Sequence, residues 1–496
     1  MNEIVADVVI VGAGNAAFCA ALAAQERGAK VVMFERAPED ERGGNSRFTA
    51  GAIRFAHEGL EDLKEIMPDL TNEEIATTDF GTYTQDEFYD DMFRVTQFRT
   101  DPDLCEKLVC DSLDTMKWMC SRGIRFVPSY GRQAFKVDGQ FRFWGGLCVE
   151  YWGGGPGLVD SETDIARANG VRIEYGARVL ELIYDGLSVS GVKVKQNGRI
   201  FDVKAKSVVI AAGGFEANHE WRTRYIGPDW DLAKVRGSRF NTGDGIRMAL
   251  DIGAAPYGNW SGCHAVGWDR NAPEFGDLDV GDNFQKHSYP FGIMINAEGK
   301  RFIDEGADFR NYTYAKYGRV ILGQPQQFAW QVFDSKVLNL LRDEYRIRQV
   351  TKVSSDTLEG LADKLEGVDK EAFLAEVAAY NDAVQTDVHF DPTVLDGRGT
   401  PSLEIPKTNW ANTIDEPPFE AYQTTCGITF TFGGLRINAA SGQVMDIDHV
   451  PIPGLYAAGE LVGGIFYFNY PGGTGLMSGS VFGRMAGASA ADALNA

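Results

Sequence analysis

The sequence is short of basic residues and of long hydrophobic runs. Its 48 Lys and Arg residues stand against 70 Asp and Glu residues, a formal net charge of -22. This excess of acid argues against nucleic acids and anionic membrane surfaces as partners. No apolar run approaches the roughly 20 residues that span a bilayer, and no basic segment of a secretory signal stands at the N-terminus. We therefore expect a cytoplasmic protein without direct membrane insertion.

Cysteines are few, and none are paired by spacing. The seven are scattered without a CxxC motif, which favours reduced thiols, most of them in the core: Cys19, Cys105, Cys110, Cys120, Cys148, Cys263 and Cys426. An iron–sulfur cluster or a zinc site of its own is therefore not expected. Glycine, by contrast, is abundant at 57 of 496 residues without any collagen-like period. We expect these glycines at tight turns and where the backbone approaches a ligand.

The strongest local signal lies at the N-terminus. In chain order it has a strand at 7–11, a GxGxxA turn at 12–17, a small-residue helix at 16–27, a second strand at 29–34, and Glu35. Gly12 permits the turn, Gly14 lets a pyrophosphate touch the backbone, and the helix N-terminus offers N–H groups to the anion. The spacing from turn to acid is that of a dinucleotide-binding fingerprint. The alternative is an ordinary βαβ unit without a ligand.

The rest of the chain suggests one such domain with an insertion. We expect a helix at 103–122, alternating strands over 171–214 with turns at Gly186 and Asn197–Gly198, two helices within 355–387, and a strand leading to Gly459. A more polar block separates the two β-α-β regions. The predicted fold is α/β with an α+β insert: a nucleotide-binding Rossmann-type domain at 1–260 and 416–496, and a capping or substrate domain at 261–415.

Two further strand-to-glycine endings bear on the cofactor. They lie at 211–214 and 456–460, far from the first turn in sequence. A permanently held FAD needs contacts at several strand ends, whereas a dissociable nicotinamide needs fewer. The pattern therefore favours a flavin.

Seven segments together resemble one flavoprotein family. They are GAGNAA, RGGNSR, NTGDG, GKRFIDEGADFRNYTYAKYG, TTCGITFTFGGL, GLYAAGE and FYFNYPGGTGLMSGSVFGR. In this order they resemble the family of fumarate reductase, succinate dehydrogenase and 3-ketosteroid dehydrogenases, over nearly the whole chain. Within that family the resemblance is greatest to the tricarballylate dehydrogenases.

The resemblance implies a set of FAD contacts. Glu35 would hold the adenosine ribose, and Val179 would offer backbone to the adenine. The full set is Gly12, Gly14, Asn15, Ala16, Glu35, Arg36, Gly43, Gly44, Asn45, Ser46, Gly51, Val179, Ala212, Gly213, Asp244, Gly459, Glu460, Gly475, Leu476 and Met477. For Asp244 and Glu460 the alternative is turn formation and capping.

The attachment of the cofactor can also be predicted. Family members with covalent FAD use a histidine just after the second glycine turn. Residues 43–53 contain none, and the nearest is His57. We therefore expect FAD to be held non-covalently.

The resemblance also implies hydride exchange between a C–C bond and the flavin, with proton transfer by Arg310. This arginine follows an Arg-Phe start with one residue more than the fumarate reductase pattern has. The alternative is an ion pair with a nearby acid, namely Asp304, Glu305 or Asp308. Tyr312 and Tyr314 are the reserve candidates. His264 matches a histidine that binds a substrate carboxylate, and the alternative is a buried structural histidine.

The chain departs from the fumarate reductase pattern at two places. Thr429–Phe430 replaces a histidine pair, and Tyr470 replaces an arginine. Fumarate and succinate are therefore not expected as substrates, and a larger acid or a compound with an apolar part fits better. Tyr467 and Tyr470 are candidates to donate hydrogen bonds to the substrate, whereas we expect Phe466 and Phe468 to pack in the core.

Three functional hypotheses follow. The first is an FAD-dependent dehydrogenase or reductase of a tricarballylate-like polycarboxylate, with a separate electron-transfer protein or membrane-linked acceptor as partner. The second is a dehydrogenase of a 3-ketosteroid or another cyclic ketone, or an enone reductase, with tyrosines as acid and base. The third is a flavin-bound subunit or sensor without turnover, which Arg310 and His264 together argue against.

Overall fold

Six strands form the sheet at the centre of the nucleotide-binding region. The computed structural model describes residues 5–494. The strand order is β20–β21–β13–β1–β2–β9, with only β20 antiparallel to its neighbour. The bounds are β1 Val8–Val11, β2 Val31–Phe34, β9 Arg172–Glu174, β13 Ser207–Ile210, β20 Gln443–Met445 and β21 Pro451–Ala457. β1, β2 and β13 are buried along their whole length, as expected for central strands of a parallel sheet. The predicted Rossmann-type fold is confirmed.

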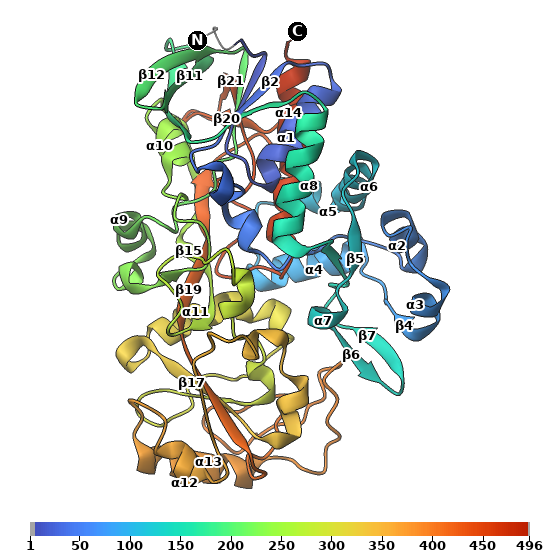
Figure 1. Ribbon diagram of the computed structural model, residues 1–496, viewed down its shortest axis with the longest axis vertical. Helices are drawn as coiled ribbons and strands as arrows, with labels where there is room; N and C mark the ends of the chain where they lie inside the picture. The colour runs from blue at the N-terminus through green and yellow to red at the C-terminus, as the bar shows by residue number, and fades with distance from the viewer. Residues whose placement is uncertain (1–4, 495–496) are drawn as a thin grey trace.

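Two helices from opposite ends of the chain pack tightly beside this sheet. These are α1 (Asn15–Glu26) and α14 (Thr474–Asp492) (Figure 1). Glycines at four-residue spacing in α14 allow the contact, because a Cβ on Gly483 would lie 2.4 Å from the Ala16 carbonyl oxygen and one on Gly487 2.0 Å from that of Ala20. The amide of Asn15 donates to the Leu476 carbonyl at 2.9 Å. The first turns of α1 and α14 are thereby held side by side.

A three-stranded antiparallel sheet covers one end of the domain. It consists of β10 (Ala177–Tyr184), β11 (Val189–Gln196) and β12 (Arg199–Lys204), with the turns where the glycines predict them. The long helix α8 (Gly154–Ala168) contacts α1. The segment between β2 and α8 forms an excursion of short elements, with bounds α2 Leu60–Ile66, α3 Asn72–Thr77, α4 Gln85–Val95, α5 Pro102–Cys110, α6 Ser112–Arg122, α7 Tyr130–Gln133, β3 Ala52–Ile53, β4 Thr78–Asp79, β5 Phe126–Pro128, β6 Ala134–Val137, β7 Gln140–Phe143 and β8 Val149–Tyr151.

Two long paired strands connect this domain to the inserted block. β15 (Pro256–Asp269) runs antiparallel to β19 (Phe419–Leu435), and β19 spans the middle of the molecule in Figure 1. β19 is also the central strand of a second sheet, which contains β14 (Lys234–Val235) and three strands of the inserted block: β16 (Ile293–Ile295), β17 (Ala329–Phe333) and β18 (Lys352–Ser355). The predicted boundary at 260 falls inside β15, and the one at 415 falls just before β19. The domain division stays a prediction.

Helices cover the far side of the inserted block. α12 (Leu358–Ala362) and α13 (Lys370–Ala383) confirm the two helices predicted within 355–387 and share a hydrophobic core with β16 and β17. α11 (Tyr314–Leu322) lies against β15 and β19, and α10 (Asp244–Leu250) follows the NTGDG segment. Within residues 5–494 no helix is both long enough and apolar enough to cross a membrane.

Two local predictions were wrong. The helix expected at 103–122 is two helices, because the chain breaks at Asp111, and the Ser112 hydroxyl there binds both the Val109 carbonyl and the Ala56 N–H. Phe468 is 46% exposed instead of packed in the core. Its backbone has a positive φ of 62° and donates to the Asn259 amide oxygen, which directs the ring outward. The cysteines follow expectation, since all seven are free and five are buried.

Candidate active site

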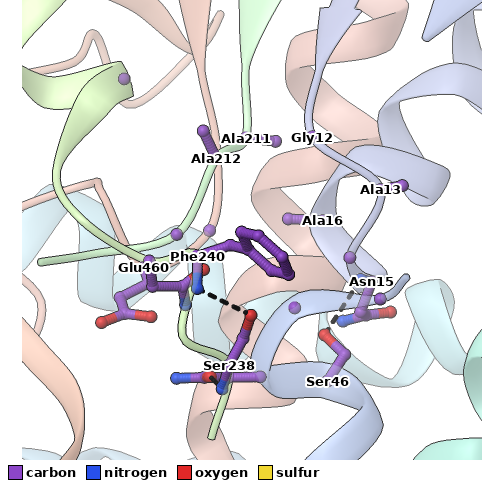
Figure 2. A pocket seen from close by; sticks show the side chains of 18 of the residues that line it. Gly12, Ala13, Asn15, Ala16, Ser46, Ala211, Ala212, Ser238, Phe240 and Glu460 are labelled. Carbon is purple, nitrogen blue, oxygen red and sulfur yellow. Dashed lines mark hydrogen bonds between the residues drawn. The ribbon is translucent and has the colours of Figure 1, made fainter. Parts of the chain in front are cut away.

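A long cavity runs along the carboxyl ends of β1, β2 and β13. The loops after these strands contribute Gly12–Ala16, Glu35–Arg36 and Ala211–Gly213, and the segment after β21 adds Ala458–Glu460. Figure 2 shows the first and third of these loops side by side, with Ala211 next to Gly12. Ligands of open α/β sheets bind at this edge, because the helices that follow the strands aim their N-termini there.

Gly12 has the geometry that the fingerprint requires. Its φ is +113°, and a Cβ added to it would lie 2.3 Å from the Ala211 carbonyl oxygen, so no side chain can be accommodated. The adjacent backbone N–H of Asn15 donates to the Ser46 hydroxyl at 3.0 Å, as drawn in Figure 2. The first and second glycine turns are therefore joined by a hydrogen bond at the wall of the cavity.

The second glycine turn shapes the opposite wall. Gly43 is left-handed, with φ +102°, and precedes the 3-10 turn Gly44–Phe48. The amide of Asn45 donates to Glu216 Oε1 and to the Thr429 carbonyl, both at 2.6 Å, and its oxygen accepts from the Ser238 N–H at 2.8 Å. Asn45 thus joins three loops from distant parts of the sequence.

Charged groups gather at the end of the cavity next to β2. The Glu35 carboxylate accepts the Ala37 N–H at 2.7 Å, and burial raises its pKa above the ordinary value. Asp244 accepts from Arg36 at 3.0 Å and from both Arg178 Nε and Nη2 at 2.9 Å. The Asp244 carboxylate therefore pairs with two guanidinium groups that line the cavity.

A pair of carboxyl groups lies at the cavity wall, where part-buried Glu460 lines the cavity and the fully buried Glu216 is its neighbour. Glu460 Oε1 accepts the Thr431 N–H at 2.8 Å, and Glu216 Oε1 accepts the Asn241 amide at 2.6 Å. Burial raises the pKa of Glu460 well above its ordinary value, and the neighbouring Glu216 raises it further. Burial likewise raises the pKa of Glu216. The pair therefore favours a protonated form.

The structure brings most of the predicted cofactor residues to this one cavity. Those that line it are Gly12, Gly14, Asn15, Ala16, Glu35, Arg36, Gly43, Gly44, Asn45, Ser46, Val179, Ala212, Gly213, Asp244, Gly459, Glu460, Gly475 and Leu476. Gly51 and Met477 do not. The Gly51 backbone packs on Gly154, where a Cβ would come within 2.7 Å of the Gly154 Cα, and the Met477 side chain is buried in the core.

These residues fit an FAD molecule. Gly12 and Gly43 leave no room for a Cβ, so the wall presents backbone at these two positions. The first turns of α1 and α14 both border the cavity, and helix N-termini favour the negative charge of a pyrophosphate or a reduced flavin. Glu35 provides an acceptor for ribose hydroxyls at the end of β2.

A second cavity adjoins the first. Thr49, Arg236, Tyr470 and Leu476 line both. The second cavity is smaller, with an empty volume of about 570 Å³ against about 1310 Å³. Its further lining is polar and comes from distant elements, including Arg132, Asp282, Gln285, His287, Arg310 and Tyr314. A small molecule in it would lie beside the cofactor cavity.

Arg310 lines this second cavity and is 9% exposed. Its Nη2 donates to the Arg132 carbonyl, its guanidinium lies over the Trp144 ring at 5.4 Å, and its Nε has no partner among the described residues. Burial lowers the pKa of Arg310, and Arg132 lowers it further, whereas Glu344 opposes the shift. The guanidinium is therefore held at the cavity with one N–H group unused.

The alternative of a local ion pair for Arg310 is not observed within residues 5–494. Each acid in question is engaged elsewhere. Asp308 pairs with Arg94 at 2.5 Å, and Glu305 pairs with Arg301 at 2.5 Å. Asp304 accepts the Thr408 N–H at 3.0 Å.

His264 and two tyrosines form a cluster at the junction of the cavities. The Tyr314 and Tyr470 hydroxyls are hydrogen-bonded at 2.7 Å, and the His264 ring lies 4.8 Å and 4.7 Å from their rings. His264 borders the cofactor cavity, and its Nε2 has no partner in the described part of the chain. Burial lowers the pKa of His264 well below its ordinary value, as does Arg236. A neutral imidazole can still donate one N–H to an anion.

Two of the candidate tyrosines lie elsewhere. The Tyr312 hydroxyl donates to Asp91 at 2.5 Å and lines a separate cavity together with His57. Tyr467 borders neither the cofactor cavity nor the cavity of Arg310. Phe466 is buried against Phe430 and Tyr470, as expected for core packing.

Sequence reasoning missed several residues of the second cavity. Arg236 precedes the NTGDG segment by five residues, and His287 stands a few residues before β16. Of the two, only Arg236 stands near a recognised motif, and that position was available as a signal. Arg132 lies in the four-residue helix α7, and nothing in its local sequence marks it.

Comparison with known proteins defines the class. The chain matches the model of the FAD binding domain family over residues 7–476. It is 31% identical to a probable fumarate reductase of Shewanella frigidimarina, over 98% of this chain and 74% of that protein. It is also 31% identical to NADH:fumarate oxidoreductase of Klebsiella pneumoniae, but covers only 47% of that longer protein.

Solved structures agree with this assignment. A flavocytochrome c3 fumarate reductase superposes with a TM-score of 0.72 at 27% identity, covering 99% of this chain and 78% of that one. A 3-ketosteroid delta1-dehydrogenase from Sterolibacterium denitrificans shares the fold, with a TM-score of 0.74 at 21% identity, covering 99% of this chain and all of that one. The chain thus belongs to the FAD binding domain family and, within it, to the flavoproteins related to fumarate reductase. It is an FAD-dependent oxidoreductase by family.

Proposed function

We propose that the protein oxidises or reduces a C–C bond next to a carboxylate or carbonyl group, and that its substrate is a tricarballylate-like polycarboxylate. The observation that carries the proposal is the second cavity, where Arg310 lies beside the cofactor cavity together with Arg132 and Arg236. Bound FAD would exchange a hydride with one carbon of that bond.

Arg310 has the proton-transfer role in this proposal. Its unpartnered Nε–H is a proton donor toward the neighbouring carbon in the reducing direction. In the oxidising direction Arg310 has to start as the neutral guanidine in order to accept a proton, and a lowered pKa raises the population of that form. His264 donates its remaining N–H to a carboxylate or to the developing enolate oxygen, and the surrounding rings exclude water.

We further propose that FAD is held without a covalent bond. His57, the nearest histidine after the second glycine turn, lies on a different cavity and contacts Cys148 at 3.6 Å. Denaturation and filtration should release the flavin. The electron partner proposed is a separate electron-transfer protein or a membrane-linked acceptor.

A second candidate is a dehydrogenase of a cyclic ketone such as a 3-ketosteroid. The hydrogen-bonded hydroxyls of Tyr314 and Tyr470 at the junction favour it, because a tyrosine pair can serve as acid and base. Arg310 would then be dispensable.

Anaerobic mixing of the FAD-loaded protein with tricarballylate, succinate and a ketosteroid separates these candidates. We expect tricarballylate to bleach the flavin absorbance, or an unsaturated tricarboxylate to reoxidise the chemically reduced flavin. Bleaching by the ketosteroid alone would favour the second candidate. A flavin that responds to no acid and no enone would contradict both and favour a subunit or sensor without turnover.

A further inference from the structure

The second cavity contains more buried positive charge than negative charge. Three arginines line it, namely Arg132, Arg236 and Arg310, against a single carboxylate, Asp282. Arg236 and Arg310 are 7% and 9% exposed. A buried cation without a partner is costly, so an uncompensated excess of this kind indicates a site for an anionic molecule.

Arg236 is the most firmly fixed of the three. Its Nε donates to Asp282 Oδ1 at 2.6 Å, its Nη2 donates to the Gln285 amide oxygen at 3.4 Å, and its backbone N–H donates to the Ile428 carbonyl at 2.8 Å. Its Nη1 has no hydrogen-bond partner anywhere in residues 5–494. One face of the guanidinium is thus anchored, and the remaining nitrogen is left for a bound molecule.

Asp282 also reaches the third arginine. Its second oxygen, Oδ2, makes no hydrogen bond within the described residues and lies 4.0 Å from Arg132 Nη1. The Asp282 carboxylate therefore compensates part of the charge of two arginines at once. Arg310 shares no carboxylate with them, although its Nη2 binds the Arg132 carbonyl oxygen.

Two guanidinium nitrogens of this cavity thus lack a hydrogen-bond partner among the described residues, and they belong to different segments of the chain. Arg310 Nε is carried by the segment before α11, and Arg236 Nη1 by the segment after β14. His287 adds a third unpartnered nitrogen, Nε2, on the same cavity. A molecule with one carboxylate can accept from only one of the two arginines, whereas a molecule with two or three carboxylates can accept from both.

We infer that Arg236, anchored by Asp282 and flanked by Arg132, binds a second carboxylate group of the substrate and selects polycarboxylates over monocarboxylates. The inference rests on the proposed function, because it places the reacting carboxylate at Arg310 and His264. Tyr470 stands where the fumarate reductase pattern has an arginine, and in this inference Arg236 supplies the cationic contact in its place.

The double variant Arg236→Gln/Asp282→Asn tests the inference. It removes both charges together, so no unpaired carboxylate is left buried. Binding of tricarballylate, succinate and butyrate to the FAD-loaded protein is measured by calorimetry and by the change in flavin absorbance. We expect tricarballylate and succinate to bind about 10- to 100-fold more weakly, and butyrate to change less than about 3-fold, because only the former lose a charge-assisted contact.

Two further variants keep the result interpretable. Arg236→Lys retains the charge and the pair with Asp282 but not the planar fork, so an intermediate loss is expected. Arg484→Gln/Asp114→Asn removes a surface ion pair of 2.8 Å outside both cavities and should leave all three affinities unchanged. Flavin content and melting temperature of each variant show whether the fold and the cofactor site are intact.

The outcomes separate the inference from the proposed function. Unchanged affinities in the double variant, or an equal loss for butyrate, would overturn the role of Arg236 while polycarboxylates still bind to the unaltered protein. Failure of every acid to bind the unaltered protein would overturn the proposed function and the inference together.

Discussion

The two adjoining cavities are built in opposite ways. The cofactor cavity is rich in glycine and alanine, many of them at the ends of parallel strands, and its charged groups include ion pairs such as Arg36 with Asp244. The second cavity is lined by several large polar side chains, among them Arg132 and Arg310. The first should therefore be sensitive to added volume, and the second to altered charge.

The largest effect is expected from volume in the cofactor cavity. A Cβ at Gly12 would lie 2.3 Å from the Ala211 carbonyl oxygen, so Gly12→Ala should abolish FAD binding or folding. Gly28→Ala is the matched control, since Gly28 also has a positive φ of +82° but nothing within 4 Å of the added atom. It should cost only about 1–3 kcal/mol of stability and retain FAD. Flavin content per chain is the measurement, and full retention in Gly12→Ala would break the comparison.

The next largest loss of activity is expected from a change of the cationic group in the second cavity. Arg310→Lys keeps the charge but loses the Nε–H and the planar guanidinium, so turnover should fall by about 10²- to 10⁴-fold with flavin content unchanged. Arg319→Lys, on the exposed face of α11, should retain full activity. Survival of turnover in Arg310→Lys would favour the tyrosine-based candidate instead.

The carboxyl pair of Glu216 and Glu460 should make the folded protein less stable as the pH rises. Burial raises the pKa of Glu216 and Glu460 in the folded protein, so above pH about 4.3 the folded state binds more protons than the unfolded state. The free energy of unfolding should therefore fall as the pH rises through the folded-state pKa of the pair, by about 1.4 kcal/mol per unit of raised pKa. Glu216→Gln should flatten this fall.

Thermal melts of the FAD-free protein from pH 5 to pH 9 check this sign. Glu220→Gln, at an exposed position of the same segment, is the control and should keep the slope of the unaltered protein. An equal slope in Glu216→Gln would mean that the pair is not protonated in the folded state.

The smallest effect is expected at the junction of the cavities. Tyr470→Phe removes the 2.7 Å hydrogen bond to Tyr314 but leaves the ring in place. Loss of one neutral hydrogen bond is worth about 1 kcal/mol, so kcat should fall by no more than about 5-fold even if the whole bond energy acts in the transition state. A fall of 10²-fold or more would identify Tyr470 as an acid or base and favour a cyclic ketone as the substrate.

The cofactor half of the site could be predicted from the sequence because its determinants are local. Gly12 and Gly14 stand within one turn, and the strand, helix and acid around them occur at fixed spacing. The backbone conformation of such a turn follows from residue type, so the motif specifies the geometry. Gly51 and Met477 were expected to contact FAD because they belong to the same motifs as residues that line the cavity. Neither of them is among its lining residues.

The substrate half could be predicted only in part. Arg310 and His264 were found through segments that resemble known proteins. Arg132 and Arg236 are brought to the same cavity by tertiary packing across more than 100 residues of sequence, and no periodicity or spacing encodes that. The break at Asp111 shows the same limit, because its cause includes a contact of Ser112 with the distant Ala56 N–H.

A crystal structure of the protein with FAD and tricarballylate bound tests the central claim most directly. The account predicts the isoalloxazine ring at the junction lined by Arg236, Tyr470 and Leu476, with one substrate carboxylate on Arg236 and the reacting carbon within reach of Arg310. A flavin ring placed away from this junction, or Arg310 turned out into bulk water in the complex, would contradict it.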